Sequence, residues 1–358
     1  MKKNIILILI TTLFIVSCNK SKKQGTISSK IYNLKGTNIF KDKFNIYNTY
    51  FIDSLLLIRN MPDKNSSVFS LFKVDQDSYS HIYDFGKIGD GPSEFENEVY
   101  YTNQFYTLNG ELKIWVYEMN KTKYSLINIT KTLEREKVIL DKEIRIKPGL
   151  SYQDLFYINE NKIVGNSDNL SLKMKRLTFY NPILDTVSKS IKLNTKIKNL
   201  KKNDLNYTQQ SYNPIFLNIL RYNSKKEKLV SAMVSMDKID IFNTDGDLEK
   251  SIFNKNNKIK EVKDYESNPK TFFADMVLTN DYIYTLYSGE LTSDYYGKSL
   301  PTKIKVYDWN YDLKAVINIK ESLNFISVDE ENAKIVGVSI TQEKTVEYSI
   351  KEFLNENI

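Results

Sequence analysis

A glycine-rich stretch near residue 90 is the first place in the chain where residue types and spacing suggest chemistry. Three of the 12 glycines, Gly86, Gly89 and Gly91, lie within six residues, and Pro92 and Glu94 follow them. Phosphate-binding loops also use clustered glycines, but they need Gly-x4-Gly-Lys-Ser/Thr or Gly-x-Gly-x-x-Gly at the start of a helix. Neither motif is present, so we expect no nucleotide ligand. We predict a structural corner, with the glycines at positive φ and the Glu94 carboxylate accepting from backbone N–H groups.

Histidine and carboxylate chemistry is limited by composition. The only histidine is His81, so the chain cannot form a zinc site built on several histidines. A Ser–His–Asp triad would have to use this one histidine. His81 lies in an alternating pattern and is predicted to be a strand residue. The sequence Asn-Thr-Asp-Gly-Asp at 243–247 resembles a calcium loop, but its glycine falls between the second and third candidate ligands, so a hairpin turn is predicted. We predict no metal, cofactor or catalytic residue, although two of the 44 acidic residues could still meet across a channel.

The chemistry of one N-terminal residue is specified more directly. Two lysines precede an apolar run from Ile5 to Val16, which is shorter than the roughly twenty residues that a bilayer span needs. The run ends in a serine followed by Cys18, the only cysteine, so residues 1–17 are predicted to be a secretory signal peptide. The junction resembles the lipobox of bacterial lipoproteins, which implies cleavage before Cys18 and a lipid anchor on it. Residues 18–30 are predicted to be the lipidated cysteine and a short flexible tether.

The net charge of +7 does not indicate nucleic-acid binding. Five lysines and no acidic residue lie within residues 1–23, so most of the excess belongs to the signal peptide and tether. Six further lysines at 189–202 are predicted to form a solvated loop or face. Arginine, which suits bidentate recognition of phosphates and bases, is scarce. We therefore expect no nucleic-acid partner.

Strands must position these residues, because no segment after the signal peptide shows a sustained helical period. Aromatic and β-branched residues are abundant, and short alternating runs end at Asn, Asp, Gly or Pro turns. A unit of strand, turn and strand recurs roughly every 50 residues, which is typical of propeller blades. We predict an all-β fold, a six-bladed β-propeller over residues 31–358. The predicted blades cover residues 45–90, 95–145, 150–195, 210–255, 268–320 and 323–355.

The most apolar strands of this repeat precede amphipathic hairpins. They lie at residues 50–58, 229–234 and 281–289. We predict that these apolar strands are the inner strands of their blades.

Three stretches carry a resemblance to a known family. They are Phe-Gly-x-x-Gly-x-Gly-Pro-x-Glu-Phe at 85–95, Tyr-x-Leu-Tyr-Ser-Gly at 284–289 with Ile-x-Val-Tyr-Asp-Trp at 304–309, and Phe-Ile-Ser-Val-Asp-Glu at 325–330. In this order they resemble the TolB-like six-bladed β-propeller lipoproteins of Bacteroides-type bacteria, which share blade features with NHL-type propellers. Ser93 departs from the glycine usual in that family. The resemblance spans the mature chain and implies a propeller fold in the cell envelope, but it brings no catalytic residues.

Two classes of function remain open. The first is a non-enzymatic binding or scaffold module for a protein or glycan of the envelope. The second is a carboxylate- or metal-dependent hydrolase or lyase, since propellers host both. The lack of histidine and of a catalytic motif favours binding. Surface-exported lipoproteins of Bacteroides-type bacteria tend to carry acidic residues just after the lipidated cysteine, whereas basic residues follow Cys18. We therefore expect a lipid anchor in the outer membrane with the protein facing the periplasm.

The candidate binding rim consists of loops rich in tyrosine. Tyr207 and Tyr212 lie in residues 194–213, which are predicted to be a long loop between blades, and Tyr295 and Tyr296 lie in a second loop, at 289–300. Tyrosine offers a large, rigid contact area, and recognition on propellers falls to rim loops and the channel mouth. The alternative for these tyrosines is packing onto the blade edges.

Overall fold

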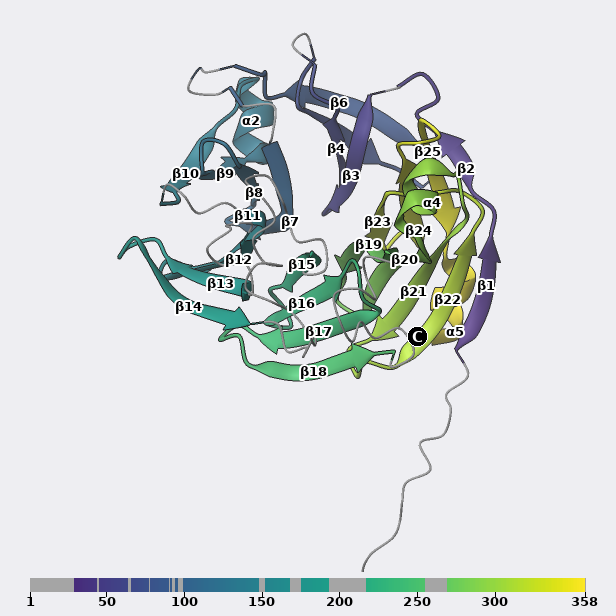
Figure 1. The fold of residues 1–358 in the computed structure, drawn as a ribbon. Helices are drawn as coiled ribbons and strands as arrows, with labels where there is room; N and C mark the ends of the chain where they lie inside the picture. The colour runs from purple at the N-terminus through teal and green to yellow at the C-terminus, as the bar shows by residue number, and fades with distance from the viewer. Residues whose placement is uncertain are drawn as a thin grey trace, which may run out of the picture.

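Six antiparallel sheets follow one another in chain order around a central axis in the described residues (Figure 1). The computed structural model describes residues 29–357, apart from 44, 64–65, 77, 90, 92–93, 96–98, 148–151, 168–174, 193–216 and 255–268. Each sheet coincides with one of the predicted units. The prediction of an all-β, six-bladed propeller is therefore confirmed.

The blades are numbered in chain order. Blade 1 contains β3 (Ile46–Ile52), β4 (Leu55–Asn60), β5 (Phe69–Val74) and β6 (Tyr79–Phe85). Blade 2 contains β7 (Val99–Leu108), β8 (Glu111–Glu118), β9 (Lys123–Asn128) and β10 (Leu140–Arg145). Blade 3 contains β11 (Tyr152–Asn159), β12 (Lys162–Ser167), β13 (Lys175–Asn181) and β14 (Thr186–Lys192). Blade 4 contains β15 (Asn218–Asn223), β16 (Lys228–Met233), β17 (Lys238–Asn243) and β18 (Leu248–Phe253). Blade 5 contains β19 (Lys270–Leu278), β20 (Tyr282–Leu291), β21 (Thr302–Asp308) and β22 (Leu313–Ile319). Blade 6 contains β23 (Phe325–Asp329), β24 (Lys334–Ser339) and β25 (Lys344–Ser349).

The N-terminal strands close the ring. β2 (Thr37–Ile39) pairs antiparallel with β25 and is the fourth strand of blade 6, whose other strands come from the end of the chain. β1 (Lys30–Leu34) pairs parallel with β22 and adds a fifth strand to blade 5. The hydrogen bonds of both strands join the N-terminal segment to the last two blades, a closure that the sequence did not predict.

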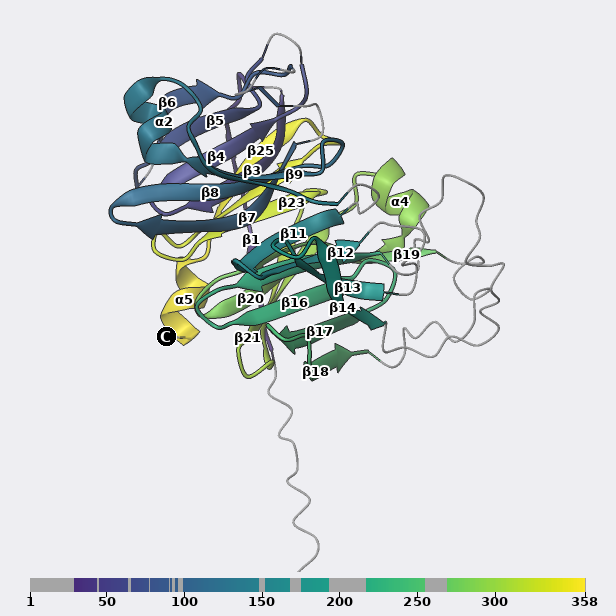
Figure 2. The same cartoon turned by 90° about the vertical axis from the view of Figure 1, so that its left-hand side faces the viewer.

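Three short helices lie outside the sheets in the described part of the chain. α2 (Ile129–Arg135) follows β9, and the Asn128 side chain accepts from Lys131 N at its N-terminus. α4 (Thr292–Gly297) joins β20 to β21, and α5 (Lys351–Asn357) follows β25. Figure 2 shows α4 and α5 on opposite faces of the ring.

The position of the most apolar strands differs from the prediction. Residues 229–233 form β16 and residues 282–289 belong to β20, and each is the second strand of its blade. The second strands are almost fully buried, because they have sheet neighbours on both edges and other blades on both faces. The true inner strands, such as β15, alternate buried and half-buried residues. They carry polar side chains that face the channel or the next blade.

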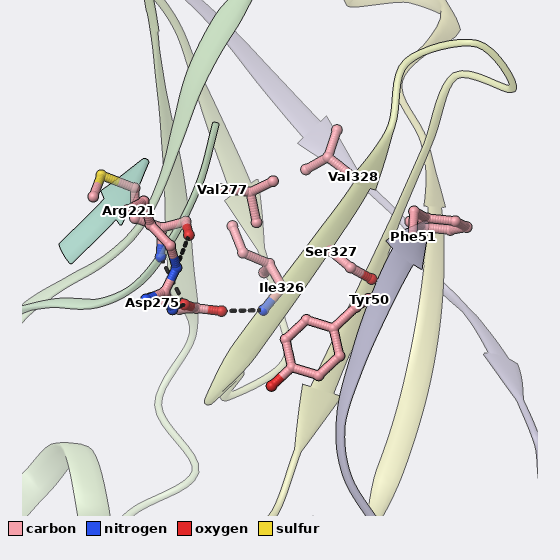
Figure 3. Close-up of a pocket in the computed structure, with 9 residues that line it drawn as sticks. Tyr50, Phe51, Arg221, Asp275, Val277, Ile326, Ser327 and Val328 are labelled. Carbon is pink, nitrogen blue, oxygen red and sulfur yellow. Dashed lines mark hydrogen bonds and ion pairs between the residues drawn. The ribbon is translucent and has the colours of Figure 1, made fainter. Parts of the chain in front are cut away.

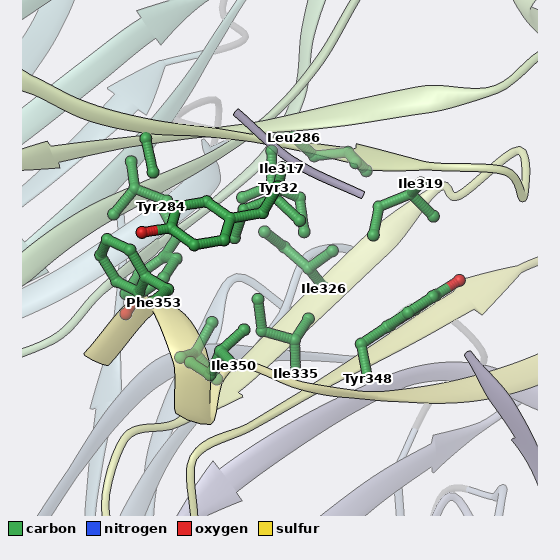
Figure 4. Packing of buried hydrophobic residues seen from close by; sticks show 14 of the residues in the cluster. Tyr32, Tyr284, Leu286, Ile317, Ile319, Ile326, Ile335, Tyr348, Ile350 and Phe353 are labelled. Atoms are coloured by element: carbon green, nitrogen blue, oxygen red, sulfur yellow. The ribbon is translucent and has the colours of Figure 1, made fainter. Parts of the chain in front are cut away.

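One hydrophobic cluster fills each of the six junctions between neighbouring blades in the described residues. The largest joins blades 5 and 6, where Leu286 and Ile317 pack near Ile335 and Tyr348 (Figure 4). Phe353 of α5 packs into the same cluster. The blades are therefore held mainly by side-chain packing, since no strand pairing in the described residues joins neighbouring blades of the ring apart from single contacts such as Phe272 N donating to Val234 O.

Candidate functional site

A large cavity opens at one mouth of the central channel. Its volume is ≈650 Å³, within the range of ligand sites. It is lined by the ends of inner strands and the turns that follow them, from blades 1, 2, 4, 5 and 6. The strands of each blade run from this mouth to the opposite rim, so the cavity lies at the other end of β20 from α4.

The lining of this channel mouth carries an excess of negative charge. Its acidic residues are Asp53, Asp329, Glu330 and Glu331, and its only basic residue is Lys225. No ion pair between described residues neutralises the four carboxylates. Unpaired carboxylates around a concave opening focus the potential and attract positively charged groups.

Aromatic and apolar side chains complete the wall. Phe51, Phe105 and Tyr222 line the cavity, and 39% of Phe105 is exposed. Apolar surface next to carboxylates suits a ligand with a cationic head and an apolar stem, such as a lysine or arginine side chain.

Two hydrogen bonds fix the carboxylate of Glu330 in the cavity. Its Oε1 accepts hydrogen bonds from Thr279 Oγ1 at 2.7 Å and from the Tyr284 hydroxyl at 2.9 Å. Partial burial raises the pKa of Glu330 above its ordinary value, although the two hydrogen bonds oppose that shift. A cavity carboxylate with a raised pKa marks a candidate functional residue.

A ring of side-chain bonds between inner strands lies deeper in the channel and holds the mouth in shape. Gln104 Oε1 accepts from Tyr157 N at 2.9 Å, which joins blades 2 and 3. Asp154 Oδ2 accepts from Leu220 N at 2.9 Å, and Asp275 Oδ2 accepts from Ile326 N at 3.0 Å. The hydroxyls of Thr49 and Ser327 lie 2.9 Å apart between blades 1 and 6.

Arg221 connects two members of this ring, Asp154 and Asp275, and Figure 3 shows its contact with Asp275. Its guanidinium donates to Asp154 Oδ1 and to Asp275 Oδ1, both at 2.9 Å, and its Nε donates to Met276 O at 3.0 Å. Burial opposes its charge, but the two carboxylates outweigh burial and keep the pKa of Arg221 above its ordinary value. The Arg221 guanidinium is paired with both carboxylates, so these three residues hold the shape of the channel and do not offer unpaired charges to a ligand.

The glycine-rich corner lies between blades 1 and 2. Gly86 has φ +77°, whereas positive φ is not found at Gly89 or Gly91, so that part of the prediction is wrong. The close approach of Glu94 explains why glycine stands at 89, where a Cβ would lie 2.1 Å from Glu94 Oε2. Glu94 Oε2 accepts from Gly91 N at 2.9 Å. Pro92 lies outside the described residues, and the structural role of the loop stays a prediction.

Two of the four predicted rim tyrosines lie in the described residues, and they differ in exposure. Tyr295, on α4, is 2% exposed and donates to Leu323 O at 3.0 Å, so it packs onto a blade edge. Tyr296 is 59% exposed. Tyr207 and Tyr212 lie outside the described residues, as does Cys18. The Tyr296 ring meets that of Tyr295 edge to face at 4.9 Å, and the grouping of this pair with Tyr207 and Tyr212 stays a prediction.

The two motifs set aside in the sequence have ordinary structural settings. His81 lies on β6 with its Nε2 3.0 Å from Asp84 Oδ1. Asn243 Oδ1 accepts from Asp245 N at 3.0 Å and from Asp247 N at 2.8 Å, which closes the turn between β17 and β18. No group of three or more His, Cys, Asp and Glu side chains in the described ranges is placed to hold a metal ion. No helix among these residues is long and apolar enough to cross a membrane.

Sequence reasoning named the channel mouth as a place for recognition but did not find the residues that line it. Asp329 and Glu330 occur in the stretch that carries the family resemblance, but no chemical motif marks them. The other residues of the cavity come from turns far away in the chain; Asp53 and Glu331, for example, are 278 residues apart in the sequence. The repeat gave one usable signal: each polar turn after an inner strand must lie at the same mouth.

Comparison with known proteins supports the fold. The sequence matches no known protein-family model and no curated protein. The structure is similar to a member of the DUF4221 family from Bacteroides vulgatus, with a TM-score of 0.54 and 10% identity over 89% of this chain and 98% of that chain. It is also similar to a protein from Bacteroides fragilis described as exported, with a TM-score of 0.52 and 12% identity over 89% and 98% of the two chains.

A third similar structure is the β-propeller domain of Cps50 (Swd1) from Myceliophteria thermophila, with a TM-score of 0.50 and 9% identity over 89% of this chain and all of that one. At such identities the likeness shows the fold alone. The chain is thus a six-bladed β-propeller whose structural neighbours include proteins of Bacteroides.

Proposed function

We propose that this protein is a non-enzymatic binding module that receives a positively charged segment of an envelope protein at its channel mouth. The observation that carries the proposal is the ≈650 Å³ cavity, whose lining contains four acidic residues and one lysine. The ring beneath it is fixed by hydrogen bonds between blades, so the site is preformed and binding costs little reorganisation. Carboxylates supplied by several blades suit an extended cationic side chain or a basic loop.

A hydrolase that uses a pair of carboxylates is the second candidate. Glu330, whose pKa lies above its ordinary value, lines the same cavity as Asp53 and Asp329, and hydrolysis by paired carboxylates needs one carboxyl group with a raised pKa. Turnover of aryl glycosides by the purified protein, abolished by Glu330→Gln, would establish this activity in place of the binding role.

Fluorescence anisotropy with a labelled tetralysine peptide tests the binding role. We expect the detergent-purified full-length protein to bind tetralysine and not tetraglutamate, with affinity that falls as salt is added. Glu331→Gln and Asp53→Asn should each weaken binding by about 2- to 5-fold, as the loss of one screened charge predicts. Asp245→Asn, which removes an exposed carboxylate from a turn outside the cavity, serves as the matched control. Equal binding of both peptides, or variants at wild-type affinity, would contradict the proposal.

The affinity for tetralysine should also depend on pH through Glu330. Its raised pKa means that the carboxylate is charged above that value and neutral below it. The contribution of Glu330 is therefore fully present at higher pH and is lost as the pH falls through its pKa, which lies above the ordinary 4.5. Glu330→Gln should remove this step from the pH profile while the rest of the profile remains.

The lipid anchor is a further part of the proposed function. We infer that the chain is a TolB-like lipoprotein held in the outer membrane and facing the periplasm, on the strength of the lipobox-like junction before Cys18 and the resemblance of residues 85–95 to that family. Growth with an alkyne analogue of palmitate should label the wild-type protein and leave Cys18→Ser unlabelled. Equal labelling of both proteins would rule out lipidation at this residue.

A further inference from the structure

A second cavity lies on blade 1, away from the channel. Its volume is ≈480 Å³, and it is formed by the connection from β2 to β3, the connection from β4 to β5, and β5 and β6 themselves. Every residue that lines it is polar, in contrast to the channel mouth with its aromatic wall. An entirely polar lining does not suit an apolar ligand.

Ser70 forms the floor of this cavity. Its Oγ accepts from Lys43 Nζ at 2.7 Å and from Asn60 Nδ2 at 3.0 Å, and its hydroxyl hydrogen-bonds the Asp84 carboxylate. The hydroxyl thus has a full set of partners, and Ser70 is 0% exposed. Its geometry is that of a structural centre that orients Lys43, Asn60 and Asp84, rather than that of a nucleophile.

Asn60 leaves an acceptor without a partner at the same place. Its Nδ2 is committed to Ser67 O at 2.8 Å and to Ser70 Oγ, which fixes the plane of the carboxamide. Its Oδ1 is buried and has no hydrogen-bond partner among the described residues. A buried acceptor left unsatisfied costs about 1–3 kcal/mol. This oxygen lies beneath the cavity surface, so contacts with a ligand fall to Lys43, Asp84 and the exposed Asn45.

The charged groups of the wall nearly balance. Lys43 has further N–H groups beyond the one that it gives to Ser70, and burial lowers the pKa of its ammonium group, an effect that the Asp84 charge opposes. Asp42 and Asn45 add exposed acceptors and a donor at the entrance. One ammonium between two carboxylates disfavours a strongly charged ligand of either sign.

We propose that this cavity binds a neutral, hydroxyl-rich ligand of the size of one sugar unit. A sugar hydroxyl both donates and accepts, so neighbouring hydroxyls can bridge an ammonium, a carboxylate and a carboxamide at once. The volume is sufficient for a monosaccharide with part of its ordered water. The site is separate from the channel mouth, so the protein could hold a glycan and a protein segment together.

Saturation-transfer NMR on the full-length protein tests this site with a panel of glucose, galactose, mannose, N-acetylglucosamine and N-acetylgalactosamine, together with disaccharides that end in each. We expect saturation of at least one sugar, and calorimetry on that sugar should show at least a tenfold loss of affinity in Asp84→Asn. A disaccharide that binds more tightly than its terminal sugar alone would identify a glycan end as the source, and equal binding would identify the free sugar.

Three controls keep the outcome decisive. Asn45→Ala changes an exposed residue at the entrance, so the variant should fold normally and still bind the sugar more weakly than the wild type. Asp245→Asn should leave sugar binding unchanged, and tetralysine binding should persist in Asp84→Asn, which separates the two sites. The absence of saturation with every sugar, or wild-type affinity in both Asp84→Asn and Asn45→Ala, would overturn the proposal.

Discussion

Replacing Asp240 by alanine should lower the free energy of unfolding by about 3–5 kcal/mol, the cost typical of breaking a buried ion pair by removing one partner. Asp240 is 0% exposed and lies between Arg176 of blade 3 and Lys238 of its own blade. Lys238 Nζ donates to its Oδ2 at 2.7 Å, and the Arg176 guanidinium and the Ser251 hydroxyl donate to the same carboxylate. Without it, two buried cations face each other.

The two cations differ in how they respond to that loss. Burial already lowers the pKa of Arg176 and of Lys238, and Asp240 opposes the shift in both. Lys238 can release its proton in the variant, whereas arginine keeps its charge in proteins. Arg176 retains its bonds to Ser231 Oγ at 2.9 Å and to Ser231 O at 2.7 Å, but these do not neutralise it. Most of the destabilisation should therefore come from Arg176.

Urea unfolding followed by tryptophan fluorescence measures this effect. Asp245→Ala is the control, because its side chain is 70% exposed and its ion pair with Lys162 is screened by solvent, so its loss should change stability by less than about 1 kcal/mol. The triple variant Arg176→Met, Lys238→Met, Asp240→Leu should recover most of the lost stability, since apolar residues of similar volume can replace a buried ion cluster. An Asp240→Ala protein as stable as the wild type would show that this cluster does not hold blades 3 and 4 together.

Tyr32→Ala should destabilise the propeller by about 3–5 kcal/mol, the usual cost of truncating a large buried aromatic residue. Tyr32 lies on β1 opposite Ile317 of β22 and is 4% exposed. Its ring meets that of Phe353 edge to face at 5.9 Å, and its hydroxyl donates to Glu356 of α5. One side chain thus links the N-terminal strand, blade 5 and the C-terminal helix.

Differential scanning calorimetry gives a clear comparison within the same strand. Ile31 is the neighbour of Tyr32 but is 61% exposed, because successive side chains point to opposite faces of a strand. Ile31→Ala should therefore change the melting temperature little. If Tyr32→Ala also melts like the wild type, β1 is not part of the cooperative unit and the ring is closed by β2 and the blade packing alone.

The sequence predicted the blades because their signals are local. Alternating strands such as residues 238–242, and turns such as Asn243–Asp247, fix a hairpin through interactions within a few residues. Repetition of that hairpin then leaves few architectures that can bury every sheet on both faces. The same local logic failed for the inner strands, where burial depends on neighbouring blades rather than on the hairpin itself.

What the sequence by itself determined is the strand, turn and strand unit, its repetition as six blades, and the order of the blades along the chain. The tertiary structure alone decided that β2 completes blade 6, that Tyr295 packs inward, and that carboxylates from Asp53 to Glu331 gather at one channel mouth. It also brought Lys43 to Ser70 and Asn60 in the cavity on blade 1. The physical reason is that these contacts depend on ring closure, which places residues far apart in the chain side by side and leaves no periodic mark in the sequence.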